Sequence, residues 1–235
     1  MDFSQDELFD ACDRLVHGLL DRAGVTHPPV DALRLADDHL GIPIEIAEPE
    51  PDDSPRRRRP SAGIVLNPHM TAEQRQAAAA QGIARHLLAD LLRKLDIVPG
   101  DESKQAATHL RGLLAARLLV PTRLLRSALR EHKYDVPALH GAFRTARMEA
   151  VAMRLLDLDS PCVIAVVDDG VVAVRRGNGA PADRKLTDAE KQCYDRVVQL
   201  ELPERVRTGG WTAHGWPVPN RPFRRVLLRA VPDEL

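Results

Sequence analysis

The chain has 235 residues, and its 33 Lys and Arg residues balance 34 Asp and Glu residues to a formal net charge of −1. This length suffices for one or two domains, and the charge balance excludes the overall basic excess that marks a dedicated nucleic-acid binder. Aromatic residues make up only 3%, so we expect a helix-rich protein with a core of Leu, Val and Ala. Cys12, Cys162 and Cys193 lie far apart without a C-x-x-C pair, which excludes a cysteine-rich zinc site and fits reduced thiols.

The first 48 residues predict two helices and a short strand. Apolar residues recur at helical spacing through residues 4–24 and again through residues 30–40, and residues 42–48 alternate as a strand does. The N-terminus is acidic and polar, unlike a signal peptide. No apolar run approaches the roughly 18 residues of a membrane helix. We therefore expect a cytoplasmic protein.

A loop follows at residues 49–60, where prolines, acids and four consecutive arginines leave no face that could be buried. Two interpretations stay open for these arginines. They contact phosphate or an acidic partner, or they simply lie in solvent. The residues concerned are Arg56, Arg57, Arg58 and Arg59.

Residues 61–121 carry the most informative pattern. The segment GIVLN (63–67) predicts a short apolar strand, and Thr71 with Gln74 forms a capping box that begins a helix running to about Leu95. A second helix is expected from about Ser103 until just before Pro121.

The segments GIVLN, ARHLL and AARLLVP resemble the ImmA/IrrE family of metallopeptidase-like regulatory proteins, and the element order is similar over residues 5–158. That family has a strand ending in Asn, a turn, a helix with His-Glu-x-x-His, and a second helix ending in Leu-Leu-x-Pro. In this chain the second motif histidine matches His86. Gly82 stands at the first histidine position, and Ile83 stands at the glutamate position.

The substitutions remove the chemistry of the motif. Two imidazoles four residues apart share one helix face and bind zinc, and the glutamate acts as general base on zinc-bound water. The family's third ligand is a glutamate on the next helix, which falls here around His109. We therefore expect no catalytic residue and no cofactor. An unusual zinc site stays an alternative, with His86, His109 and either Asp90 or Glu102 as its ligands.

Residues 122–158 predict two or three short helices with a break around residues 134–137. The resemblance implies a unit similar to a helix-turn-helix here, with a DNA-reading helix at about residues 145–156. Arg144, Arg147 and Arg154 would then contact DNA. The same segment also fits helices that pack on the core.

From Pro161 the pattern changes to a β-hairpin with an Asp169-Gly170 turn, then a helix at about residues 187–199, then turns and strands. The fold class expected is helix-rich α+β, with a peptidase-like core at 1–121, a helical segment at 122–160 and a small α+β appendage at 161–235. Trp211 and Trp216 of the appendage are either its core or an interface surface.

The leading functional hypothesis is an inactive peptidase relative that regulates by binding, because active family members cleave a helix-turn-helix repressor and so switch on a stress or mobile-element programme. The partner implied is such a repressor. A divergent zinc peptidase and a DNA-binding regulator are the alternatives. An extended peptide from the partner would add to the strand edge. The residues expected to bind it are Ile64, Val65, Leu66, Asn67 and His86, with Trp211 and Trp216 adding a second contact.

Overall fold

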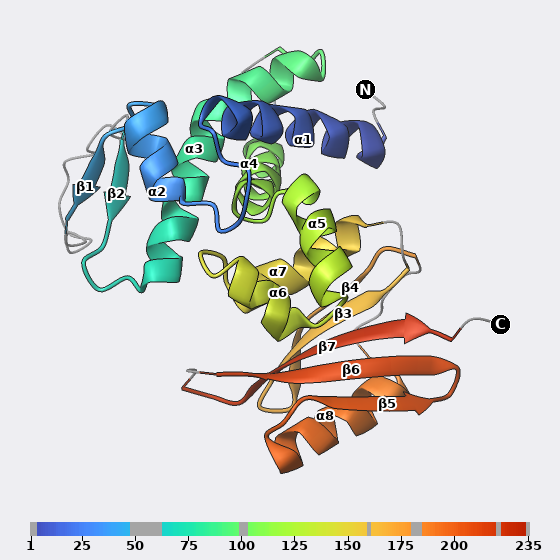
Figure 1. Cartoon of the computed structure of the whole chain (residues 1–235). Helices are drawn as coiled ribbons and strands as arrows, with labels where there is room; N and C mark the ends of the chain where they lie inside the picture. Colours follow the sequence, from blue (N-terminus) through green and yellow to red (C-terminus); the bar gives the residue numbers. More distant parts are fainter. Residues whose placement is uncertain are drawn as a thin grey trace. The chain divides into compact units, whose positions relative to one another are not determined.

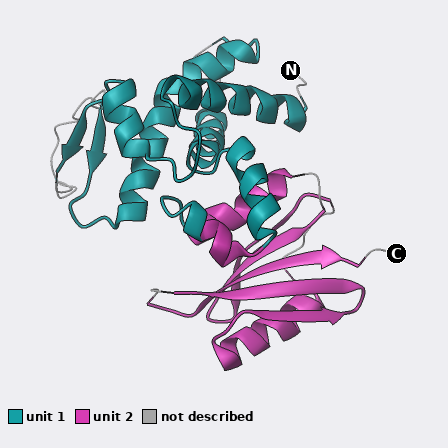
Figure 2. Cartoon of the chain, in the orientation of Figure 1, with its two compact units in different colours: residues 1–134, 141–147 teal, residues 135–140, 148–235 magenta. Residues whose placement is uncertain are grey.

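The computed structural model describes residues 4–47, 63–98, 103–158, 161–179, 185–219 and 222–233. The chain is helix-rich α+β, as expected from the sequence (Figure 1). It divides into two compact units, one of residues 1–134 and 141–147 and the other of residues 135–140 and 148–235 (Figure 2). Among the described helices, none has the length and apolar character to cross a membrane. The arginine run 56–59 lies outside the described residues.

Unit 1 is built mainly from helices, and the predicted helix starts are confirmed. Capping boxes begin two of them, Ser4 with Glu7 and Thr71 with Gln74, so the first free N–H groups of both helices have acceptors. The helices are α1 (Gln5–Arg22), α2 (Ala32–Arg34) with a π-helical turn (Leu35–His39), α3 (Ala72–Lys94), α4 (Lys104–Leu119) and α5 (Thr122–His132).

A two-stranded parallel sheet completes unit 1, formed by β1 (Ile44–Ile46) and β2 (Ile64–Leu66). Both strands were expected from their alternating or apolar residues. In β2, Ile64 and Leu66 are buried, whereas Val65 is 51% exposed, as the period of a strand requires. β2 contacts α3, so one face of the small sheet is closed by the helix.

A buried arginine ties α1, α4 and α5 together. Arg117 of α4 is 1% exposed, its guanidinium carbon lies 4.0 Å from the centre of the Phe9 ring, and its Nε is 3.4 Å from a carboxylate oxygen of Asp13. Burial lowers the pKa of Arg117, and the Asp13 carboxylate acts in the opposite direction. The Thr122 hydroxyl donates to the same carboxylate at 2.8 Å. Asp13 thus contacts two helices, as the ion-pair partner of Arg117 in α4 and as the acceptor of the Thr122 hydroxyl in α5.

We expect Asp13→Ala to lower the free energy of unfolding by about 3 kcal/mol, because a buried guanidinium loses its carboxylate. Arg117→Met should cost less, since it removes the charge and keeps most of the volume. The double variant should resemble Arg117→Met in urea unfolding. Asp38→Ala is the matched control, because its pair with Arg34 is exposed and worth about 1 kcal/mol or less. A double variant that loses the sum of both single effects would contradict the pairing.

Unit 2 is a five-stranded antiparallel sheet in the order β4-β3-β7-β6-β5. The Asp169-Gly170 turn and the following helix are where the sequence predicted them. Helix α8 packs on one face of the sheet, and α7 contacts β3 and β7. The strands are β3 (Val163–Asp168), β4 (Val171–Gly177), β5 (Glu204–Thr208), β6 (Trp211–Val218) and β7 (Arg225–Pro232); the helices are α6 (Val136–Ala142), α7 (Met148–Arg154), a 3-10 turn (Leu155–Asp157) and α8 (Asp188–Leu200).

Alternate residues of the strands build the two faces of this sheet. The face toward α8 holds small and branched side chains such as Ala165, Ala213 and Leu228, which pack with Cys193 and Val197 of the helix. Burial raises the pKa of the Cys193 thiol to about 12, so this thiol is neutral and part of the core.

Each of the two compact units consists of two separate segments of the chain. Helix α5 belongs to unit 1, whereas α7 and most of α6 belong to unit 2. The segments 1–121, 122–160 and 161–235 remain a prediction of domain boundaries.

Candidate functional site

The point where β2 meets α3 is the position of the degenerate zinc motif. Gly82 is buried in α3, and a Cβ atom built on it would lie 2.3 Å from Cγ1 and 2.7 Å from Cδ1 of Ile64. Real Cβ atoms essentially never come that close to another heavy atom. The side chain of Ile64 therefore occupies the space in which the first histidine of the motif would begin. Any larger residue at position 82 would have to displace the strand or the isoleucine.

The other motif positions do not converge on a metal. Ile83 is fully buried, and His86 is exposed on the outer side of α3. His109 of α4 is also exposed, and Asp90 forms an ion pair with Arg93 at 2.8 Å. In the described part of the chain, no group of three or more His, Cys, Asp or Glu residues is placed to hold a metal ion. Glu102 lies outside that part. The residues present do not fit a zinc ion held as in His-Glu-x-x-His.

The backbone of β2 faces two ways. The N–H of Ile64 donates to the carbonyl of Pro43 at 2.8 Å, and the carbonyl of Leu66 accepts from the N–H of Ala47 at 3.0 Å. Successive residues of a strand point their polar groups to opposite sides. The N–H and C=O of Val65 therefore point away from β1, and no described strand pairs with that side. This is the edge at which an extended peptide could add.

Local hydrogen bonds hold the turn between β2 and α3. The side chain of Asn67 accepts from the N–H of His69 at 2.8 Å, and the guanidinium of Arg75 donates to the carbonyl of Pro68 at 2.9 Å. Gln76 is 8% exposed and accepts from the N–H of Ala32 at 2.7 Å. No sequence pattern marks the role of Gln76, because its partner lies 44 positions away.

The IrrE N-terminal-like domain, the family model of the M78 peptidases, matches residues 37–156, which is just over half of the chain. The chain belongs to the IrrE-like family. Its structure is similar to that of a Mycobacterium tuberculosis transcriptional regulator, with a TM-score of 0.66 and 18% sequence identity over 96% of this chain and 80% of that chain. This likeness shows a shared fold. A search of curated proteins finds no match.

The helix-turn-helix-like segment of this IrrE-like chain differs from the expectation. The predicted DNA-reading helix at 145–156 is the seven-residue α7 and a 3-10 turn, and α7 packs against β3 and β7. Arg154 is 3% exposed and paired with Asp157, so the prediction that it contacts DNA is wrong. Arg144 is exposed and Arg147 half-buried, and both precede the helix. Periodicity predicted a helix but not which face tertiary packing would cover.

The two tryptophans of unit 2 lie on opposite faces of β6. Trp216 is 4% exposed, which places it in the core rather than on an interface surface. Trp211 is half-buried against the cluster beneath α8. Of the two interpretations left open by the sequence, the core position is the one that the burial of Trp216 supports.

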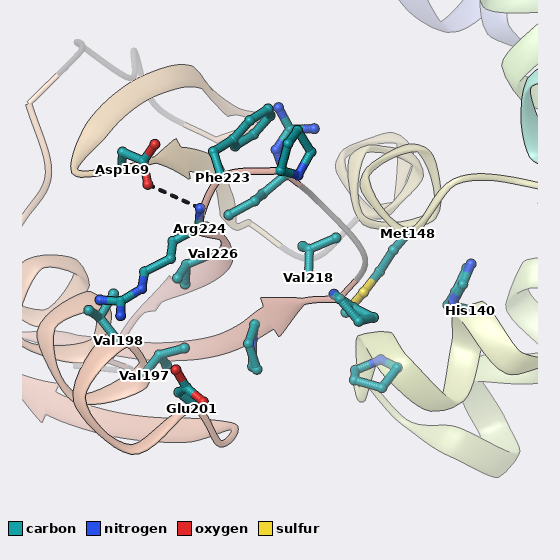
Figure 3. Close-up of a pocket in the computed structure, with 15 residues that line it drawn as sticks. His140, Met148, Asp169, Val197, Val198, Glu201, Val218, Phe223, Arg224 and Val226 are labelled. Atoms are coloured by element: carbon teal, nitrogen blue, oxygen red, sulfur yellow. Dashed lines mark hydrogen bonds between the residues drawn. The ribbon is translucent and has the colours of Figure 1, made fainter. Parts of the chain in front are cut away.

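Unit 2 also contains a cavity of about 970 Å³ that sequence reasoning missed. Figure 3 shows its lining, which includes Val197 of α8, Glu201 just after that helix, Val218 of β6 and Met148 of α7. At one side Asp169 accepts from the N–H of Arg224 at 3.0 Å, and its own N–H donates to the carbonyl of Arg224 at 2.9 Å. The β3–β4 turn is thereby fastened to the start of β7. No sequence motif marks the cavity, because its residues come from five separate elements.

Arg225 beside this cavity is held by two carboxylates. It donates to both oxygens of Asp168 at 2.6 Å and to Glu149 of α7 at 2.5 Å. The hydrogen bonds that Arg225 donates to Asp168 raise the pKa of Arg225, burial lowers it, and the hydrogen bond to Glu149 raises it further. The network links α7 to the strands that it covers.

We expect Gly82→Ala to lower the free energy of unfolding by up to about 2 kcal/mol, because overpacking against Ile64 costs about 1–3 kcal/mol and the gain in helix propensity returns about 1 kcal/mol. Gly112→Ala in α4 is the control. Nothing lies within 4 Å of a Cβ at that position, so this variant should be neutral or stabilising by up to about 1 kcal/mol.

The sign of the Gly82→Ala effect should reverse in an Ile64→Ala background, since the isoleucine no longer fills the space. Urea unfolding of the four members of this double-mutant cycle measures the interaction. An unchanged destabilisation in the Ile64→Ala background would show that Ile64 is not what excludes a side chain at position 82.

Proposed function

We propose that this IrrE-like protein is a regulator that acts by binding a partner protein and does not hydrolyse peptides. The observation that carries the proposal is the side chain of Ile64 in the space beside Gly82. A zinc peptidase needs two imidazoles, a general base and room for a water molecule at this place. Here a branched aliphatic side chain takes the room, and a second one, Ile83, stands at the position of the base.

The same arrangement supports binding of an extended peptide. The outward N–H and C=O of Val65 offer one donor and one acceptor, while Ile64 and Leu66 anchor the strand on α3. Main-chain hydrogen bonds to such an edge supply affinity, and neighbouring side chains supply specificity. The family resemblance suggests a helix-turn-helix repressor as the partner, and a regulatory role fits the fold shared with a transcriptional regulator.

The zinc content of the purified, untagged chain tests the proposal that the protein does not hydrolyse peptides. We expect elemental mass spectrometry to find no stoichiometric zinc in the wild type or in His86→Ala, because one exposed imidazole cannot hold the ion alone. Stoichiometric zinc that disappears with His86→Ala would support a divergent zinc peptidase instead. Chelator-sensitive cleavage of a repressor would then be the next measurement.

The substitution Val65→Pro tests the proposal that a peptide of the partner binds at the edge of β2. Proline removes the outward N–H of β2, whereas the bonds of Ile64 and Leu66 to the β1 side stay in place. We expect binding of a helix-turn-helix repressor as partner to weaken by about tenfold or more, measured by titration calorimetry.

Val65→Thr is the matched control, because it keeps the N–H and the β-branch and should bind as the wild type does. His86→Ala should also leave binding nearly unchanged. Equal binding by Val65→Pro and Val65→Thr would place the partner elsewhere. Steep salt dependence of binding to bare duplex DNA would favour the DNA-binding alternative.

A further inference from the structure

The face of the unit 2 sheet away from α8 carries a row of basic side chains. Arg205 of β5 stands opposite His214 of β6, and His214 stands opposite Arg229 of β7. The three strands are neighbours in the sheet (Figure 1). Leu228 packs beneath α8, and successive residues of a strand point to opposite faces, so Arg229 and the rest of the row lie on the other face. Because Cβ atoms directly opposite one another are only about 5 Å apart, two guanidinium groups flank one imidazole.

This row runs from a buried position to an exposed one. Arg229 is 7% exposed, His214 is half-buried and Arg205 is exposed. Beyond Arg229 the next position, on β3, is the fully buried Ile164. The imidazole ring of His214 lies 6.0 Å from the ring of the buried Trp216, which limits its movement along β6. The row is therefore closed at its inner end and open to solvent at β5.

The two guanidinium groups act on the imidazole between them. Burial lowers the pKa of His214, and the charges of Arg205 and Arg229 lower it further. The carboxylate of Asp135 acts in the opposite direction. Like charges that stand opposite one another destabilise a sheet. An anion bound across the row would remove this repulsion and would stabilise the protonated imidazole.

The acid nearest the outer end of the row is already engaged by other side chains. Asp233 accepts from Arg207 at 2.9 Å and from the Thr212 hydroxyl at 2.7 Å, two residues along the strands from the row. Arg205 forms no ion pair with any residue in the described ranges. Its exposed guanidinium can therefore reach an anion from solvent.

At the inner end, Arg229 donates a hydrogen bond to the thiol of Cys162. Burial raises the pKa of this thiol, and the charge and hydrogen bond of Arg229 lower it. Burial has the larger effect, so the thiol is neutral. This contact orients the guanidinium and leaves its positive charge in place.

We propose that Arg205, His214 and Arg229 bind a single phosphate group, carried by inorganic phosphate or by a small phosphate monoester. Guanidinium groups match the oxygen atoms of phosphate in geometry and charge. A phosphate group offers three acceptor oxygens, one for each side chain of the row, whereas a carboxylate offers two.

The surroundings of the row favour one phosphate over the successive phosphates of a nucleic acid, which need basic groups in series. The flanking positions on the same face of β6 are Thr212 and Trp216, and neither is basic. The proposed site lies in unit 2, and it goes beyond the proposed peptide binding at β2 of unit 1. Either proposal can therefore fail without the other.

Nuclear magnetic resonance of the full chain tests the proposal, with phosphate replacing chloride at constant pH and ionic strength. We expect the imidazole signals of His214, identified by their loss in His214→Asn, to shift in a saturable way. The pKa of His214 should rise in phosphate, because the bound anion stabilises the imidazolium. The same titration with methyl phosphate distinguishes the two sources, since the tighter of the two ligands identifies the form that the site prefers.

Two arginine variants on one strand test the position of the site. Arg205→Gln should raise the phosphate dissociation constant by about tenfold, because it removes a charge-assisted contact. Arg207→Gln is the matched control, since it makes the same charge change on β5 but lies outside the row and is paired with Asp233. It should change the constant by about twofold or less, as a screened charge does.

Three results would overturn the proposal. One is a wild type whose His214 signals do not respond to phosphate. Another is an equal response to acetate, which would contradict the class of ligand. The third is an equal loss of binding in Arg205→Gln and Arg207→Gln, which would show a general attraction to the charges of β5 instead of a site.

Discussion

The contact of Ile64 with the bare backbone of Gly82 is the constraint on which unit 1 depends. A glycine in the middle of a helix costs roughly 1 kcal/mol relative to alanine, so its presence in α3 requires a compensating gain. The gain is the close approach of β2, which buries Ile64 and Leu66 on the helix. The position of the strand follows from that approach. The position of the strand in turn decides where its backbone groups point. Those of Ile64 and Leu66 point toward β1, and those of Val65 point outward.

The contact between Ile64 and Gly82 takes the place of a zinc site, but it does not involve the outward backbone groups of Val65. In a zinc peptidase the helix and the strand face each other across a polar space that holds a metal ion and a water molecule. Here an aliphatic side chain fills that space, and interiors packed in this way exclude water. The outward backbone groups of Val65 take no part in this contact, and an edge of this kind needs only main-chain groups to bind a peptide. The proposed loss of catalysis and the proposed binding of a peptide are therefore compatible within one scaffold.

Unit 2 is organised by paired charges within an otherwise apolar sheet. Arg225 joins Asp168 and Glu149, and Arg175 joins Glu190, so that α7 and α8 are each fastened to the sheet by one arginine. Removing one partner of such a buried pair costs more than the pair itself contributes. With both faces covered, the surfaces still able to pair are the edges. The edge strand β5 exposes arginines, which prevent pairing with other strands, whereas the edge strand β4 exposes valines.

The sequence by itself determined the local structure and the family. The capping box at Thr71, the Asp169-Gly170 turn and the apolar strand at 63–67 act through neighbouring residues, and each was found where it was predicted. The resemblance to the family also placed Gly82 and Ile83 at the motif positions, because its flanking segments could be matched along the chain.

Only the tertiary structure decided what fills the space that the motif left, and which side chains reach the surface. The contact between Ile64 and Gly82, the burial of Arg154 and Trp216, and the bulge at Ala173 each depend on a residue far away in the chain or on an adjacent strand. Periodicity shows that a residue lies on a face, but not what covers that face. Recognition of the degenerate motif thus came from sequence, whereas the identity of the side chain that fills its place required the packing.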